Sequence, residues 1–159
     1  MSGLLNERFN VIPSAVAGSN TQYSEGAALT LEDVVLSKVN ISSKPSAGLT
    51  YRFKLCGTAA GATDVMNLVL RLGRTAVMTL AAPGADEVDW MAEFVIRFTD
   101  STNQRVMGYL VGNGIARVVD YAVGTVDCTA GAEMKVQIYN TNVADTVTCE
   151  MCTVESWVK

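Results

Sequence analysis

Residues 90–98 read Trp90-Met-Ala-Glu-Phe-Val-Ile-Arg-Phe98, and this stretch decides the class of fold. Every second residue is aromatic or aliphatic, and the residues between them include Glu93 and Arg97. Because successive side chains of a β-strand point to opposite faces, an alternation of this length predicts a half-buried strand. We therefore expect a central core strand with Phe94 and Ile96 inside, and Glu93 and Arg97 on the opposite face.

Shorter runs of the same kind flank this stretch and are separated by turn residues. Strands are predicted in the second half of 29–41, and at 50–57, 68–72, 76–80, 105–111, 115–119, 134–139 and 146–154. The segment 29–41 also fits a helical period, and its β-branched residues favour a strand. Leu72-Gly-Arg-Thr75 predicts a hairpin, and the glycine-rich stretches 57–61 and 108–114 predict turns.

Eight or nine short strands without amphipathic helices between them indicate an all-β fold. The prediction is an antiparallel β-sandwich, jelly-roll-like, that occupies residues 23–159 as one domain. Residues 1–22 show neither a helical nor a strand period and are expected to form an extended N-terminal arm. This arm either orders along a neighbouring molecule or is a disordered tail. Its large apolar residues, the candidates for an assembly interface, are Leu4, Leu5, Phe9, Val11 and Ile12.

The composition favours an oligomer. Of the 159 residues, 49% are hydrophobic and 18% are charged, and the mean hydropathy is +0.24. A single small domain leaves most residues partly exposed, so this apolar surplus suggests surface hidden against other subunits. We expect a homo-oligomer, most simply a trimer; the alternative is a well-filled sandwich core.

The charge pattern argues against two classes of partner. There are 12 basic and 16 acidic residues, a net charge of −4, and no two basic residues are adjacent in the sequence. Binding to a phosphate backbone needs several cations on one face, so no nucleic-acid partner is expected. No segment approaches the roughly 18 apolar residues of a membrane span, so we expect synthesis in the cytoplasm and no membrane partner.

Four cysteines, Cys56, Cys128, Cys149 and Cys152, invite a metal or disulfide interpretation. Cys149 and Cys152 fall within one predicted strand, where residues three apart point to opposite faces. Such a pair could not bind one ion, so buried free thiols are expected, with no metal site and no cofactor.

A search for catalytic groups predicts that the chain is not an enzyme. It contains no histidine, the commonest general base. Carboxylates cluster at Glu32-Asp33 and at Asp86, Glu87 and Asp89, and such clusters are usually solvated turns. The second cluster could instead supply oxygen ligands to calcium. Trp90 heads the apolar face of the long strand, which leaves Trp157 as the one candidate tryptophan for a surface contact.

Four segments carry a resemblance to a known group of proteins. They are Gly48-Leu-Thr-Tyr-Arg-Phe-Lys-Leu-Cys-Gly-Thr58, Leu68-Val-Leu-Arg-Leu-Gly73, Asp89-Trp90 and Asn142-Val-Ala-Asp-Thr-Val-Thr148. In rhythm, more than in any signature motif, they resemble tailed-bacteriophage virion proteins over roughly residues 35 to 155. The resemblance implies a β-sandwich, typically trimeric, that serves as a capsid decoration (cement) protein or as a head-fibre or tail-fibre domain. It carries no catalytic residues.

The expected function is therefore structural. A decoration protein sits on the capsid exterior of the virion, contacts the major capsid protein or another virion protein, and stabilises the head by bridging capsid subunits. The alternative is a head-fibre or tail-fibre receptor-binding domain whose loop 99–104 recognises a glycan. The oligomer symmetry and the virion protein contacted are left open.

Overall fold

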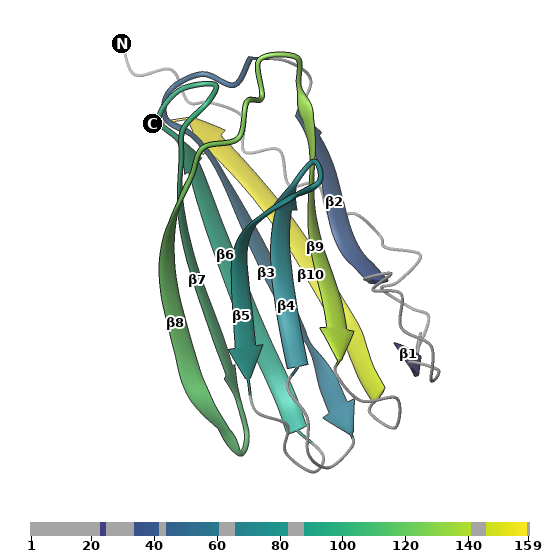
Figure 1. Ribbon diagram of the computed structural model, residues 1–159. Coiled ribbons are helices and arrows are strands. Elements are labelled where there is room, and N and C mark those ends of the chain that lie inside the picture. The colour runs from purple at the N-terminus through teal and green to yellow at the C-terminus, as the bar shows by residue number, and fades with distance from the viewer. Residues whose placement is uncertain are drawn as a thin grey trace.

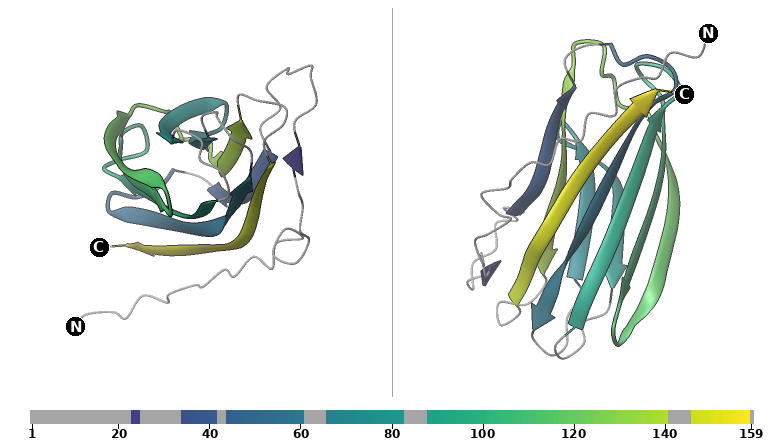
Figure 2. Two further views of the ribbon diagram at one scale, coloured as in Figure 1. Left: turned by 90° about the horizontal axis from the view of Figure 1, so that it is seen from below. Right: turned by 180° about the vertical axis from the view of Figure 1, so that it is seen from behind.

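The computed structural model describes residues 23–24, 34–41, 44–60, 66–82, 88–140 and 146–158, and forms two antiparallel sheets packed face to face (Figures 1 and 2). The larger sheet has the order β1-β10-β3-β6-β7-β8 and the smaller one β2-β9-β4-β5. The strands are β1 (Tyr23–Ser24), β2 (Val34–Ile41), β3 (Leu49–Ala60), β4 (Met66–Leu72), β5 (Thr75–Ala82), β6 (Val88–Phe98), β7 (Gln104–Gly112), β8 (Ile115–Gly124), β9 (Ala132–Asn140) and β10 (Thr146–Val158).

The connectivity is that of a jelly roll with one added hairpin. Early strands pair with late ones from the outside inwards: β1 with β10, β2 with β9, β3 with β6, and β4 with β5. Those eight strands alternate between the sheets as a jelly roll requires. The hairpin β7–β8 extends the larger sheet beyond β6. The predicted antiparallel sandwich of jelly-roll type is thus confirmed.

The long alternating run is a central strand, as predicted. β6 lies between β3 and β7, and its even-numbered residues from Trp90 to Phe98 are buried in the core. Phe94 and Ile96 have no exposed surface, whereas Arg97 on the other face is exposed. The leucines of β4 (Leu68, Leu70 and Leu72) belong to the same buried core from the opposite sheet, because the same two-residue period puts their side chains inside.

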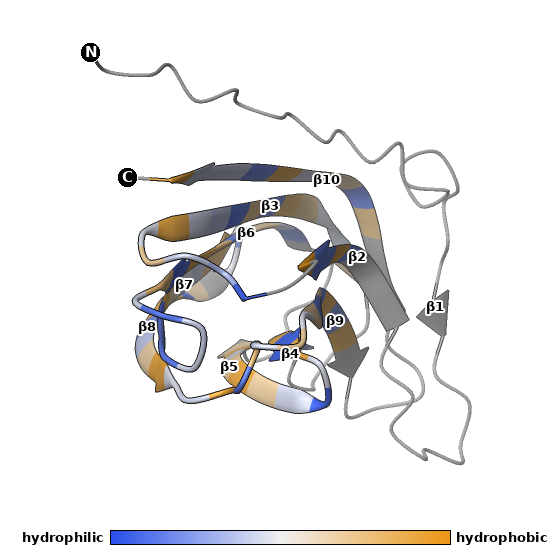
Figure 3. Ribbon diagram, turned by 90° about the horizontal axis from the view of Figure 1, so that it is seen from above, coloured by the Kyte–Doolittle hydropathy of each residue, from blue (hydrophilic) through white to orange (hydrophobic). Residues whose placement is uncertain are grey.

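A glycine lets the added hairpin close one side of the sandwich. β5 lies against β7 and β8, and β8 stands between β7 and β5 when the molecule is seen from above (Figure 3). A Cβ atom on Gly108 of β7 would lie 2.6 Å from the Met78 sulfur and 3.1 Å from carbon atoms of Leu80 and Phe94. The prediction of turns at 57–61 and 108–114 is wrong for residues 57–60, which lie within β3, and for residues 108–112, which lie within β7. Asn113 and Gly114 do form a turn.

Glycines form the turns of two hairpins, of which the one at Leu72–Thr75 was predicted as a hairpin. Gly73 and Gly114, in the turns β4–β5 and β7–β8, have φ values of +56° and +80°, a region that L-residues with side chains rarely adopt. Three strands continue at least three residues past their predicted ends: β3 to Ala60, β8 to Gly124 and β10 to Val158. The predicted arm, residues 1–22, lies outside the described residues.

A β-bulge overturns the argument from cysteine spacing. The pairing of β10 with β3 shifts between Cys149 and Met151, so one extra residue, Glu150, is inserted into the strand. The bulge resets the alternation, and Cys149 and Cys152 are both buried on the inner face, 5% and 6% exposed. The expectation that they point to opposite faces is wrong. All four cysteines are free thiols in the structure.

Candidate functional site

The outer face of the larger sheet is the candidate functional site. Strand pairing aligns its outward residues in rows that run from β10 across β3, β6 and β7 to β8. One row reads Trp157, Thr50, Arg97, Arg105 and Val123; the next reads Glu155, Arg52, Val95, Met107 and Tyr121. The third reads Thr153, Lys54, Glu93, Tyr109 and Val119; the fourth begins Met151, Cys56, Met91 and Val111.

A network of ion pairs holds the centre of this face. Arg52 Nη1 donates a hydrogen bond to Glu155 at 3.3 Å, and Lys54 donates one to the other oxygen of the same carboxylate at 3.2 Å. Arg52 Nε also lies 3.3 Å from Glu93 Oε1, an ion pair without hydrogen-bond geometry. The Arg52 guanidinium lies 5.2 Å from the ring centre of Trp157, within cation–π range. These charges are satisfied within the chain.

Towards β8 the face is apolar and basic. Met107, Tyr121 and Val123 are 47%, 61% and 54% exposed, and they adjoin Arg97 and Arg105. The two arginines lie directly opposite each other on β6 and β7, an arrangement of like charges that destabilises an isolated sheet. Neither has an ion-pair partner among the described side chains. We call Arg97, Arg105, Met107, Tyr121 and Val123 the basic patch.

The opposite end of the face, over β10 and β6, is apolar and acidic. Met91 and Met151 are 48% and 57% exposed and flank Cys56 of β3. Asp89 and Glu150 are exposed beside them and have no ion-pair partner within the described part of the chain. Glu150 lies close enough to Cys56 to contribute, after burial, to raising the pKa of that thiol. We call Asp89, Met91, Glu150 and Met151 the acidic patch.

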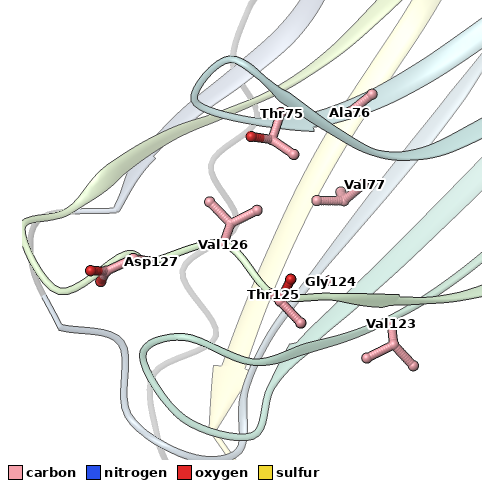
Figure 4. Close-up of a pocket in the computed structure, with 8 residues that line it drawn as sticks. All are labelled: Thr75, Ala76, Val77, Val123, Gly124, Thr125, Val126 and Asp127. Atoms are coloured by element: carbon pink, nitrogen blue, oxygen red, sulfur yellow. The ribbon is translucent and has the colours of Figure 1, made fainter.

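A cleft of about 400 Å³ lies elsewhere, between the start of β5 and the end of β8 (Figure 4). Its lining is Thr75, Ala76, Val77, Val123, Gly124, Thr125, Val126 and Asp127. The carboxylate of Asp127, its one charged group, already accepts hydrogen bonds from the Thr129 backbone at 2.9 Å and hydroxyl at 2.7 Å. These bonds lower the pKa of Asp127. The one carboxylate in the lining is thus already engaged by Thr129.

The loop 99–104, the candidate for glycan recognition, is closed on itself. The Asp100 carboxylate accepts bonds from the backbone and side chains of Thr102 and Asn103 at 2.7–3.0 Å, and the backbone bond from Thr102 contributes most to lowering its pKa. Gln104 has no exposed surface and exchanges two hydrogen bonds with the Val126 backbone. These polar groups are thus hydrogen-bonded within the loop and to Val126.

The other residues singled out by sequence are placed as follows. Trp157 lies half-buried on the outer face of β10, at the row of the two arginines, and Trp90 is in the core. Asp89 is exposed on β6. The remaining candidates, Leu4, Leu5, Phe9, Val11 and Ile12, and the acids Glu32, Asp33, Asp86 and Glu87, fall outside the described residues.

Sequence reasoning missed the pairing of Arg97 with Arg105. Scattered basic residues were expected to make no patch, but register places these two side by side although they are eight positions apart. The signal was present in the alternation on either side of the Asp100–Asn103 turn, which puts both arginines on the outer face. Counting adjacent basic residues could not detect a pair formed across strands.

No family model matches the chain, and neither does any curated protein. Among the described residues, no group of three cysteine or acidic side chains is arranged to hold a metal ion. None of the described segments forms a helix that is long and apolar enough to cross a membrane.

Proposed function

We propose that this chain is a structural, non-enzymatic subunit that assembles through the outer face of its larger sheet. In this role it coats a larger particle, as a trimeric capsid decoration protein of a bacteriophage virion. The observation that carries the proposal is the exposure of Met91, Met107, Val119, Tyr121 and Val123 on one sheet face.

Exposed apolar groups of this kind are unusual in a protein that works alone. Single exposed hydrophobic residues are normal, but these lie in neighbouring rows of adjoining strands. Methionine, tyrosine and arginine are the residues enriched in protein interfaces, whereas lysine and aspartate are depleted. The β6–β8 half of the face has this composition, and covering it would remove apolar surface from water.

The proposal is tested by searching purified virus particles for the protein. Gel densitometry and mass spectrometry should find it at a fixed copy number, in the hundreds, as expected for a subunit repeated over a symmetric shell. Limited biotinylation of intact particles should label it, because it lies on the capsid exterior. Its absence from purified particles would contradict the proposal, and a copy number of about a dozen would favour a fibre.

A further inference from the structure

We propose that the basic patch of one copy docks on the acidic patch of a second copy. This inference rests on the proposed function and names the partner of the same face. The charges of each patch are unpaired within one copy. Among the described residues, Arg97 and Arg105 have no acidic ion-pair partner, and Asp89 and Glu150 have no basic one. Each patch also places exposed methionines or other apolar groups next to its charges.

The charges select a copy of this chain as the occupant. The basic patch contributes two positive charges and the acidic patch two negative ones, so one patch neutralises the other. Setting aside Arg97 and Arg105 of the 12 basic residues leaves 10 against 16 acidic ones, a net charge of −6 for the rest of the chain. Outside its own basic patch, a second copy is therefore an acidic partner for the arginines.

The apolar groups fit the same contact. Met107, Tyr121 and Val123 of one copy would face Met91 and Met151 of the next. Unbranched methionines adapt their shape to a partner, and tyrosine supplies a large amphipathic contact. The neutral network of Arg52, Glu93, Lys54 and Glu155 separates the two patches and leaves each with its own unbalanced charge.

The position of the patches allows two kinds of assembly. Because they lie at different ends of one face, two copies packed face to face can make the contact twice, as an isologous pair. Copies inclined to one another can instead each use the basic patch towards one neighbour and the acidic patch towards another. A heterologous contact of this kind closes into rings when its rotation permits, which includes the proposed trimer. It also disfavours direct superposition of two basic patches, because like charges would then meet.

The test uses charge reversal in the full chain, with oligomer mass measured by sedimentation equilibrium. Arg97→Glu with Arg105→Glu makes both patches acidic, and Asp89→Arg with Glu150→Arg makes both basic. Each double variant should weaken association about 100-fold or more. The four substitutions together restore opposite signs and should restore the wild-type mass. Lys44→Glu with Arg74→Glu, an equal charge change outside this face, is the matched control and should leave the mass unchanged.

Circular dichroism first establishes that each variant is folded. The oligomer masses then decide whether the basic patch of one copy docks on the acidic patch of another. Double variants that keep the wild-type mass would overturn the inference, as would a fourfold variant that stays dissociated or a wild-type chain that is monomeric. A dimer that dissociates on charge reversal and reforms in the fourfold variant would support the contact while contradicting the trimer. Particle association is scored separately, so a failed copy-to-copy contact on a particle-bound protein would leave the proposed function standing.

Discussion

Gly108 is the residue at which the added hairpin meets the core. It is buried on the inner face of β7, and a side chain introduced at this position would meet atoms of Met78, Leu80 and Phe94 first. We expect Gly108→Val to lower the free energy of unfolding by about 1–3 kcal/mol, the usual cost of overpacking. Urea unfolding measures this.

The matched control for that change is Ala81→Val on the neighbouring β5, where the side chain is exposed. It adds methyl groups to a strand without entering the core, so its effect should stay within about 0.5 kcal/mol. Equal losses at Gly108 and Ala81 would show that β7 does not approach β5 as closely as described.

Cys149 makes stability depend on alkaline pH. Burial, followed by the nearby thiols of Cys152 and Cys56, raises the pKa of Cys149 from 9.0 to about 12. Because the folded state holds this proton more tightly than the unfolded chain, the contribution is complete below about pH 9 and is lost as the pH rises towards about 12. Wild-type stability should therefore fall more between pH 8 and pH 10.5 than that of Cys149→Ala.

Urea unfolding at the two pH values gives this difference directly. Thiol labelling at pH 8 is an independent check, since only the thiolate reacts. Cys149 should remain unlabelled until the chain unfolds. An equal loss of stability in both proteins, or rapid labelling of native Cys149, would contradict its burial.

At the level of strands, β6 is where the core is most sensitive. Phe94 packs at the centre of the larger sheet with no exposed surface, so Phe94→Ala should cost about 3–5 kcal/mol in thermal or urea unfolding. Arg97→Ala on the opposite face should change stability by less than about 0.5 kcal/mol. Glu93→Ala should lie between them, because it removes one of the two acids that neutralise Arg52. A larger loss of stability at Arg97 than at Phe94 would show that the two faces of β6 have been assigned the wrong way round.

Strand identity and facing could be predicted from the sequence because alternation is a local property. Phe94, Ile96 and the leucines of β4 were placed correctly for this reason. Two kinds of feature could not be predicted. The bulge at Glu150, which turns Cys149 and Cys152 to one side, depends on pairing with β3, and the approach of Gly108 to Met78 depends on packing between sheets. The alternation of residues along a single strand carries no information about either feature.

The candidate site also combines features that local alternation predicts with features that depend on strand pairing. Alternation within the predicted strand 105–111 puts Met107 and Tyr109 on outward positions, and the apolar surplus in the composition indicates that such a surface exists. Tyr121 and Val123 lie past the predicted end of their strand at residue 119. The strand order decides which outward residues become neighbours. The pairing of Arg97 with Arg105 could have been inferred from the alternation on either side of the turn between them. The placement of Met151 and Met91 on either side of Cys56 follows from the strand order and was beyond the sequence pattern.

For the whole molecule, the sequence predicts that residues 1–22 act in assembly. Each large apolar side chain among them would contribute roughly 1.5–3 kcal/mol on burial, before the cost of ordering the chain. Expression of residues 23–159 should leave the β circular-dichroism spectrum unchanged and weaken particle binding or oligomer formation. A truncated chain that assembles and binds as tightly as the full one would return the segment to the disordered-tail alternative.

The most direct test of the outer face as an assembly surface is the oxidation of methionines by peroxide in the native full chain. Met91, Met107 and Met151 are about half exposed in a single chain, whereas Met78 and Met134 are buried in the core and serve as internal controls. At tens of micromolar protein, mass spectrometry should show the three outer methionines protected, with protection lost on dilution below the dissociation constant of the oligomer. Oxidation of all three at the rate of a free methionine at every concentration and on the particle, with Met78 and Met134 still protected, would contradict the account.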